Sequence, residues 1–315
     1  MVTTRSMKSE GDQQPEPREV EGQKPDGPRL YRGNCHCGEF VYEAELPEIR
    51  SAMECNCSIC HKKGYLWVFP AEGSKFEIIK GTKDSLTQYA FGKKSLAHKA
   101  SQFCPTCATP VMGEFIGGNG RAFNVRAIQG VDSWALEKQP YDGAALGDKY
   151  APPDHQGPFP SDIDGYKPIT GSCHCGAVTV AFMSKPIDEK CDDDIAECNC
   201  SICMRNAYRW IYPKKERVVL FAKEPSNIGR YSFGRHVLNK TFCNICGVCM
   251  TNEYNPLTDE ERKALGALPT GGFGERMKTG HPINLRIFPD LDFAKMKAPE
   301  LKNGANKISP PYKNP

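Results

Sequence analysis

The chain has 315 residues, enough for two domains of ordinary size, and its 41 basic and 38 acidic residues leave a formal net charge of only +3. The two kinds of charge are interspersed, so we expect no nucleic-acid partner. The mean hydropathy is −0.53 and no apolar run approaches the roughly 18 residues of a membrane span, so we expect no membrane partner either. The composition leaves the oligomeric state open.

The first residues carry no apolar core of the kind found in secretory signals, so we expect a cytoplasmic location, with a nuclear one as the alternative. In a reducing compartment sixteen cysteines are not expected to form a disulfide framework. Cysteines at short spacings then predict metal binding or catalysis.

The elements predicted in the first half of the chain are mostly strands. Residues 1–29 are rich in Pro, Gly, Glu, Gln and Lys, which predicts a disordered tail. A first domain is expected over 30–142. Within it, short β-branched and aromatic runs between turn residues predict strands at 40–44, 65–69 and 76–79.

A linker is predicted at 143–165, where four prolines stand among glycines and aspartates. The second domain is expected over 166–294, with strands at 178–182, 208–212 and 218–221. An insertion at 256–280 contains Thr258 and Glu261 at capping-box spacing, which predicts a short helix, followed by a flexible loop at 271–274. Residues 295–315 are expected to form a C-terminal tail. The fold class that follows is mainly β, with two tandem domains and few short helices.

One cysteine pattern occurs twice, about 140 residues apart, which indicates a tandem duplication. Each copy has a Cys-His-Cys-Gly motif, a Cys-Asn-Cys-Ser-Ile-Cys motif and a Phe-Cys-x-x-Cys motif. The match extends beyond the cysteines, since Tyr89-Ala90-Phe91 corresponds to Tyr231-Ser232-Phe233. The repeated cysteines are Cys35, Cys37, Cys55, Cys57, Cys60, Cys104 and Cys107 in the first copy, and Cys173, Cys175, Cys198, Cys200, Cys203, Cys243 and Cys246 in the second.

Seven cysteines divide naturally into four and three. Closed structural zinc sites have four protein ligands, and catalytic zinc sites have three with one open position. Pairing the first and last motifs gives two four-sulfur sites: Cys35, Cys37, Cys104 and Cys107, then Cys173, Cys175, Cys243 and Cys246. Two sets of three remain: Cys55, Cys57 and Cys60, then Cys198, Cys200 and Cys203. We therefore expect up to two zinc ions per domain, although another choice of four, or an all-structural role for the seven, stays open.

Residues near these motifs carry further expectations. His36 and His174 lie between paired cysteines and should pack or form hydrogen bonds beside the metal rather than bind it. Cys191 and Cys249 stand outside the repeat and are expected to be buried thiols. Three cations are substrate candidates, with a purely structural or surface role as the alternative: Arg126 and Arg286, which could bind a carboxylate, and Lys62, which could attract an anion.

The three motifs resemble those of the glutathione-dependent formaldehyde-activating enzymes and centromere protein V. The resemblance covers both copies, about 30–142 and 167–290. It implies a β fold similar to the Mss4-like family around the four-cysteine zinc, and a catalytic zinc at Cys55, Cys57 and Cys60. It also implies a carbon–sulfur lyase whose partners are a small thiol such as glutathione and a small aldehyde such as formaldehyde, joined as S-hydroxymethylglutathione.

Two other functions stay open at this stage: a non-catalytic zinc module similar to centromere protein V, and a tailoring enzyme of small-molecule metabolism. The copies also differ beside the second motif, where His61-Lys62-Lys63-Gly64 corresponds to Met204-Arg205-Asn206-Ala207. Because the second copy departs further from the family pattern and carries the insertion, the sequence favours the first copy as the more enzyme-like half.

Overall fold

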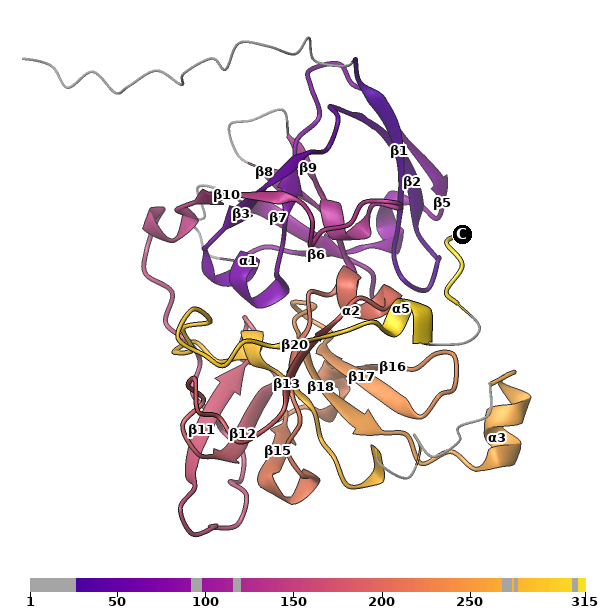
Figure 1. The fold of residues 1–315 in the computed structure, drawn as a ribbon. Helices are drawn as coiled ribbons and strands as arrows, with labels where there is room; N and C mark the ends of the chain where they lie inside the picture. The colour runs from indigo at the N-terminus through magenta and orange to yellow at the C-terminus, as the bar shows by residue number, and fades with distance from the viewer. Residues whose placement is uncertain (1–26, 92–97, 116–119, 268–273, 275–276, 308–310) are drawn as a thin grey trace, which may run out of the picture.

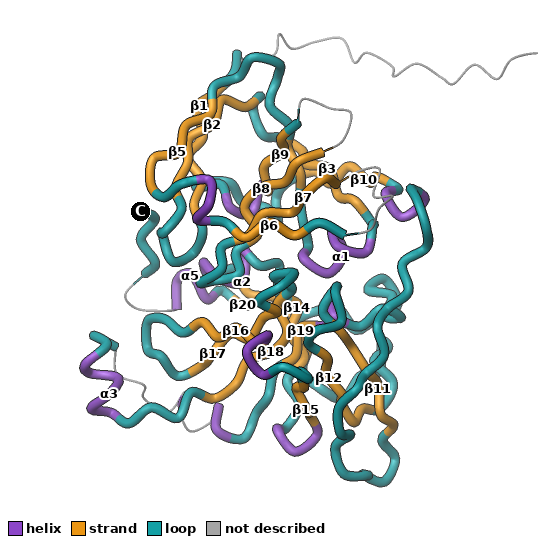
Figure 2. Tube along the Cα trace, turned by 180° about the vertical axis from the view of Figure 1, so that it is seen from behind, coloured by secondary structure: helices purple, strands orange, loops and turns teal. Residues whose placement is uncertain are grey.

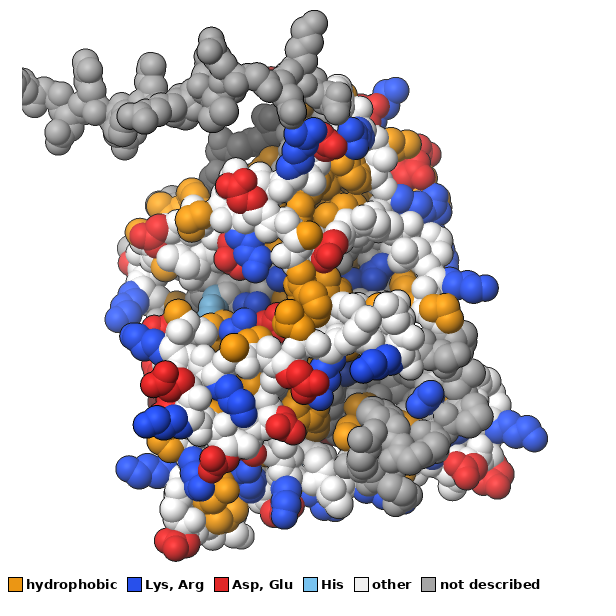
Figure 3. Space-filling model, in the orientation of Figure 1, with side chains coloured by type: hydrophobic (Ala, Val, Ile, Leu, Met, Phe, Trp, Pro, Cys, Tyr) orange, Lys and Arg blue, Asp and Glu red, His pale blue; other side chains and the backbone are white. Residues whose placement is uncertain are grey.

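The computed structural model describes residues 27–91, 98–115, 120–267, 274, 277–307 and 311–315. Most of the expected N-terminal tail and of the loop at 271–274 lies outside these residues. None of the helices in the described ranges is long and apolar enough to cross a membrane. Figure 3 shows basic and acidic side chains interspersed over one face of the molecule.

The fold is mainly β, as predicted, and is built from two domains of the same design (Figure 1). Each has a three-stranded antiparallel sheet beside a seven-stranded one. In the first domain the small sheet has the order β1 (Arg29–Asn34), β2 (Val41–Leu46), β5 (Phe76–Lys80). The large sheet has the order β10 (Glu137–Tyr141), β3 (Ser51–Cys55), β4 (Trp67–Val68), β9 (Arg121–Asn124), β8 (Pro110–Phe115), β7 (His98–Phe103), β6 (Thr87–Tyr89).

The second domain repeats this topology. Its small sheet has the order β11 (Lys167–Ser172), β12 (Thr179–Ser184), β15 (Val218–Phe221). Its large sheet has the order β16 (Ile228–Tyr231), β17 (Leu238–Cys243), β18 (Cys249–Tyr254), β19 (Ile283–Asn284), β14 (Arg209–Ile211), β13 (Ile195–Cys198), β20 (Glu300–Lys302). Named helices are α1 (Ser58–Lys63), α2 (Ser201–Arg205), α3 (Asp259–Ala264) and α5 (Gly304–Lys307).

The six strands predicted from apolar runs are confirmed, with β15 matching 218–221 and β4 shortened to two residues. The capping box is also confirmed, because the Thr258 hydroxyl accepts the N–H of Glu261 (3.2 Å) and the Glu261 carboxylate accepts that of Thr258 (2.7 Å). It begins α3, so the described part of the insertion contains the expected short helix.

The expected C-terminal tail, in contrast, contains an element of the second domain. β20 pairs in parallel with β13, as β10 pairs in parallel with β3. The sheet therefore extends beyond the boundary expected at 294. The sequence did not reveal this strand because Glu300 and Leu301 are exposed and only Lys302 is half-buried, which leaves no alternation of apolar residues.

After its parallel strand, each domain sends a segment across to the other domain. The C-terminal segment runs beside β13 and ends next to the first domain (Figure 1), and the segment after β10 descends along the second domain (Figure 2). Tyr150 in the expected linker donates its hydroxyl to the carbonyl of His174 (2.8 Å). Tyr312 does the same to His36 (2.8 Å). Each domain is thus tied to the other by the segment that follows its own parallel strand.

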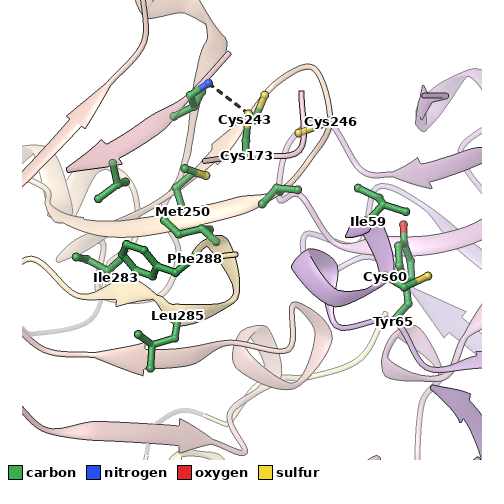
Figure 4. Close-up of a cluster of buried hydrophobic side chains, with 14 of the residues drawn as sticks. Ile59, Cys60, Tyr65, Cys173, Cys243, Cys246, Met250, Ile283, Leu285 and Phe288 are labelled. Atoms are coloured by element: carbon green, nitrogen blue, oxygen red, sulfur yellow. Dashed lines mark hydrogen bonds between the residues drawn. The ribbon is translucent and has the colours of Figure 1, made fainter. Parts of the chain in front are cut away.

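The main buried cluster continues across the boundary between the domains. It joins Ile59, Cys60 and Tyr65 of the first domain to Met250 and Leu285 of the second, among others (Figure 4). Because one apolar core serves both copies, their relative placement is fixed by packing as well as by the two crossing segments.

Candidate metal centres

The structure assembles the four-plus-three division of the cysteines in both domains. All sixteen cysteines are thiols, and four groups have their sulfur atoms within 4.8 Å of one another. The four-cysteine clusters are Cys35, Cys37, Cys104 and Cys107 in the first domain, and Cys173, Cys175, Cys243 and Cys246 in the second. The three-cysteine clusters are Cys55, Cys57 and Cys60, and Cys198, Cys200 and Cys203.

The four-cysteine clusters have the dimensions of a zinc site. Sulfur–sulfur distances of 3.4 Å (Cys35 to Cys37) and 3.6 Å (Cys175 to Cys243) are close to the ~3.8 Å edge of a tetrahedron with Zn–S bonds of about 2.3 Å. A turn closes the Cys-x-x-Cys loop, because the N–H of Gly247 donates to the carbonyl of Cys243 (2.8 Å) with Gly247 at φ +68°. Both sets therefore fit a closed tetrahedral ion.

Each three-cysteine cluster lies where a strand gives way to a short helix. In the first domain Cys55 ends β3, Cys57 precedes α1 and Cys60 lies in α1. The indole N–H of Trp67 donates to the Cys60 sulfur (3.2 Å), and that of Trp210 donates to Cys203 (3.5 Å). Within the described residues no fourth cysteine, histidine or carboxylate completes either group, which is the donor set of an ion with one open position.

The sulfurs of these clusters share their protons unequally. The thiols of Cys200 and Cys203 donate to Cys198 and lower its pKa to about 2. In the first domain the contact with Cys55 raises the pKa of Cys57 to about 12. In the second group Cys198 is thus the preferred position for negative charge, and the interacting thiols of a group lose their protons in steps.

A backbone segment from beyond each parallel strand closes over the three-cysteine cluster. The side-chain amide of Asn56 accepts the N–H of Ala144 (2.8 Å) and donates to Asp142 (2.8 Å), which seats Gly143 against Cys55. Any Cβ at Gly143 would overlap the Cys55 sulfur. The counterparts in the second domain are Asn199, Ala305, Asn303, Gly304 and Cys198. The repeated Cys-Asn-Cys motif carries the asparagine twice, and this repetition is the signal in the sequence that could indicate the role.

The two histidines pack and form hydrogen bonds, as expected, and they do so with the opposite domain. The His36 ring nitrogens bond to the hydroxyls of Tyr231 (2.8 Å) and Ser201 (2.9 Å). Those of His174 bond to Tyr89 (2.8 Å) and Ser58 (2.9 Å). Burial lowers the pKa of His36 to about 3 and that of His174 to about 4, so both rings are neutral.

Each histidine also lies inside an aromatic cage. Tyr312 stacks on His36 with ring centroids 4.6 Å apart, and Tyr150 stacks on His174 at 4.5 Å. Phe233 and Phe91 contact the same two rings at 4.5 Å. The cages join one domain's four-cysteine cluster to the other domain's three-cysteine helix.

Lys62 does not have the position expected of a residue that attracts substrate. It is 3% exposed, and its ammonium donates to the carbonyls of Ser172 (2.9 Å) and Ile287 (2.9 Å) in the second domain. Burial lowers its pKa to about 8. The side chain therefore ties the domains together, as its counterpart Arg205 does through the carbonyl and side chain of Asn34. The sequence alone could not show that α1 faces another domain.

Arg126 and Arg286 lie together at the boundary between the domains. The Nε of Arg126 donates to the carbonyl of Gly64 (2.7 Å), and that of Arg286 donates to Ala207 (2.7 Å). Their Nη1 atoms donate to Ser133 Oγ (3.1 Å) and to the carbonyl of His61 (3.2 Å), respectively. Burial lowers the pKa of each guanidinium to about 10.

A small cavity of about 10 Å³ opens beside the second three-cysteine cluster, between the domains. That volume is about the space for one water molecule. It is lined by Arg126, Trp134, Glu197, Cys198, Cys203, Met204, Ala207, Tyr208 and Arg286. The two arginines singled out from the sequence thus meet two of the cysteines at one place. Cys191 and Cys249, in contrast, are buried thiols outside all four clusters.

Comparison with known proteins identifies the repeated unit. The family model described as "glutathione-dependent formaldehyde-activating enzyme" matches residues 30–139 and again 168–286. A crystal structure of a Rhodobacter sphaeroides protein is 17% identical, with a TM-score of 0.30, over 42% of this chain and 100% of that one. The two family matches together span most of the chain and contain all fourteen repeated cysteines. The chain therefore belongs to the glutathione-dependent formaldehyde-activating enzyme family and carries its domain twice.

Proposed function

We propose that the protein is a zinc-dependent carbon–sulfur lyase that forms or cleaves an adduct between a small thiol and a small aldehyde. The observation that carries this proposal is the pair of three-cysteine clusters, each separate from a four-cysteine cluster and lacking a fourth protein donor within the described residues. In the forward direction the sulfur of the thiol bonds to the carbonyl carbon. The carbonyl oxygen becomes a hydroxyl by taking up the proton that the thiol loses, so no oxidant or reductant is required.

A zinc ion with an open position lowers the pKa of a thiol and polarises a carbonyl, and both effects assist this addition. The residues of the chain position the donors. The indole of Trp67 holds the Cys60 sulfur by a hydrogen bond, and Asn56 holds the segment that covers Cys55. The equivalent contacts recur in the second domain. The four-cysteine clusters are assigned to structural zinc, because four sulfurs leave no position for a substrate.

The partners proposed for the reaction are glutathione and formaldehyde. They come from the family to which the chain belongs, whose description names both. A cytoplasmic location goes with this proposal, because thiolate ligands and free glutathione both require a reducing compartment.

The proposal is tested on the full chain by counting zinc and by following thiol–aldehyde exchange. Four clusters predict four zinc ions per chain, with one lost in Cys57→Ser and one in Cys200→Ser while the circular dichroism of the fold persists. Cys191→Ser is the matched control, because it removes a buried thiol outside the clusters. Exchange between formaldehyde and glutathione, measured by NMR, should exceed the uncatalysed rate and fall to it when both three-cysteine clusters are altered.

Two results would contradict the proposal. If exchange never exceeds the uncatalysed rate with glutathione, the chain is not an enzyme for this reaction. If Cys57→Ser and Cys200→Ser unfold the protein as completely as loss of a four-cysteine cluster does, the three-cysteine zinc is structural, and a non-catalytic zinc module is the better description.

A further inference from the structure

The cavity beside the second three-cysteine cluster is built by both domains. Arg126 and Trp134 come from the first domain and meet Cys198 and Cys203 of the second. Arg286 completes the set from the second domain. Cys198 and Cys203 both line the cavity, so it adjoins the second three-cysteine cluster.

Both arginines bring positive charge to this cavity, and neither forms an ion pair in the described part of the chain. Their Nε and Nη1 atoms donate to neutral oxygens only, so the charges themselves stay uncompensated by direct contact. Two carboxylates stand nearby: Glu54, and Glu197, which lines the cavity and is paired with Arg209 at 2.6 Å. Partly buried guanidinium groups without a direct ion pair favour an anionic partner.

The residues around the first cluster differ from these. Phe293 replaces Ser133, since each follows an aspartate whose Oδ1 accepts the N–H of the residue two positions on. The Phe293 ring packs 5.2 Å from the His61 ring and 4.4 Å from the guanidinium of Arg209. All three cysteines of the first cluster are buried, whereas Cys198 of the second is partly exposed. The first cluster is therefore the more enclosed of the two.

We propose that the second three-cysteine centre, rather than the first, receives the substrate, and that Arg126 and Arg286 bind a negatively charged group of that substrate beside the sulfurs. The inference rests on the proposed function and deepens it, because it assigns the centre that receives the thiol and the residues that bind a carboxylate of that thiol. The site is then built by both domains, because Arg126 of the first domain lies beside the three-cysteine centre of the second. The cavity has room for about one water molecule, so entry of a carboxylate requires a lining side chain such as Trp134 or Met204 to turn aside.

The test uses the full chain with cobalt(II) in place of zinc, because a thiolate that joins the metal changes its visible spectrum. The probes are 3-mercaptopropionate, an anionic thiol, and 2-mercaptoethanol, a neutral thiol of similar size. We expect the anionic thiol to bind at least tenfold more tightly to the wild type. Arg126→Met and Arg286→Met should each reduce that preference to about twofold or less, while Arg126→Lys retains part of it. Arg230→Met is the control, because Arg230 is exposed, pairs with Glu253 and does not line the cavity.

Cysteine variants then locate the binding. The spectral change should persist in Cys55→Ser and disappear in Cys198→Ser, with Cys203→Ser as a second variant if Cys198→Ser does not fold. A preference that is unchanged in both arginine variants, or a signal that follows Cys55, overturns the inference and leaves the proposed lyase intact. If neither thiol alters the spectrum of the wild type, the proposed function fails together with it.

Discussion

The two domains agree in their cysteines and in the contacts that join them, and they differ around their three-cysteine clusters. His36 and His174 make matched pairs of hydrogen bonds to the opposite domain, and matched tyrosines cover them. In contrast, Lys63 has Asn206 as its counterpart, and Ser133 has Phe293. The cysteines of the metal sites and the histidine contacts that join the domains are thus present in both copies. The residues around the three-cysteine clusters, which a substrate would contact, differ between the copies.

The two copies therefore differ where the domains meet, and not in the cysteines that form the metal sites. A single copy of this domain would expose the face of α1 that carries Lys62 and Lys63, both of which are 3% exposed in the tandem chain. Burying two ammonium groups is costly unless their donors are satisfied, and here the carbonyls of the second domain satisfy them. The duplication therefore supplies each copy with the partner surface that it needs.

The strongest test of equivalence is the loss of a four-cysteine cluster. Cys107→Ser and Cys246→Ser should each release one zinc ion and unfold the chain, because structural zinc contributes on the order of 10 kcal/mol or more to such domains, which exceeds a typical net stability. Zinc per chain and thermal unfolding by circular dichroism measure this. The Cys191→Ser control should melt within a few degrees of the wild type. A variant that keeps its fold after losing the zinc would show that one copy does not depend on it.

The next largest effect concerns the histidine cages. His36→Ala and His174→Ala each remove two hydrogen bonds and a stacked ring contact, so each should lower the free energy of unfolding by about 3 kcal/mol. Urea titration followed by tryptophan fluorescence measures it. Because the two cages are matched, the losses should agree within about 1 kcal/mol. A clear inequality would break the pseudo-symmetry that the contacts describe.

The smallest expected effect on the free energy of unfolding concerns Lys63 and its counterpart, Asn206. Lys63→Met removes donors to the carbonyls of Gly247 (2.9 Å) and Cys246 (3.2 Å), and should cost about 2 kcal/mol. Asn206 is buried, and neither its Oδ1 nor its Nδ2 has a hydrogen-bond partner among the described residues. Asn206→Leu should therefore be neutral or stabilising by about 1 kcal/mol. Urea titration of both variants checks the opposite signs, and equal destabilisation would contradict the difference between the copies.

The sequence by itself determined the ligand sets, because metal chemistry acts through spacing and residue type. Fourteen cysteines in two identical orders fixed the duplication and the division into four and three, which the clustered sulfurs reproduce. Apolar runs predicted the six strands, and the capping box predicted α3. These signals are local, so they can be read without knowing what else lies nearby in space.

Only the tertiary structure decided how the copies use one another. In the sequence, Lys62 is a cation two residues after Cys60. In the structure, its ammonium donates to carbonyls of residues 110 and 225 positions away. The strand β20 and the tyrosines of the crossing segments are likewise defined by long-range pairing. The proposal that the second centre receives the substrate likewise depends on Arg126, which reaches the cavity of that centre from the other domain. Such contacts depend on the packing of two domains against each other, and no local pattern encodes that arrangement.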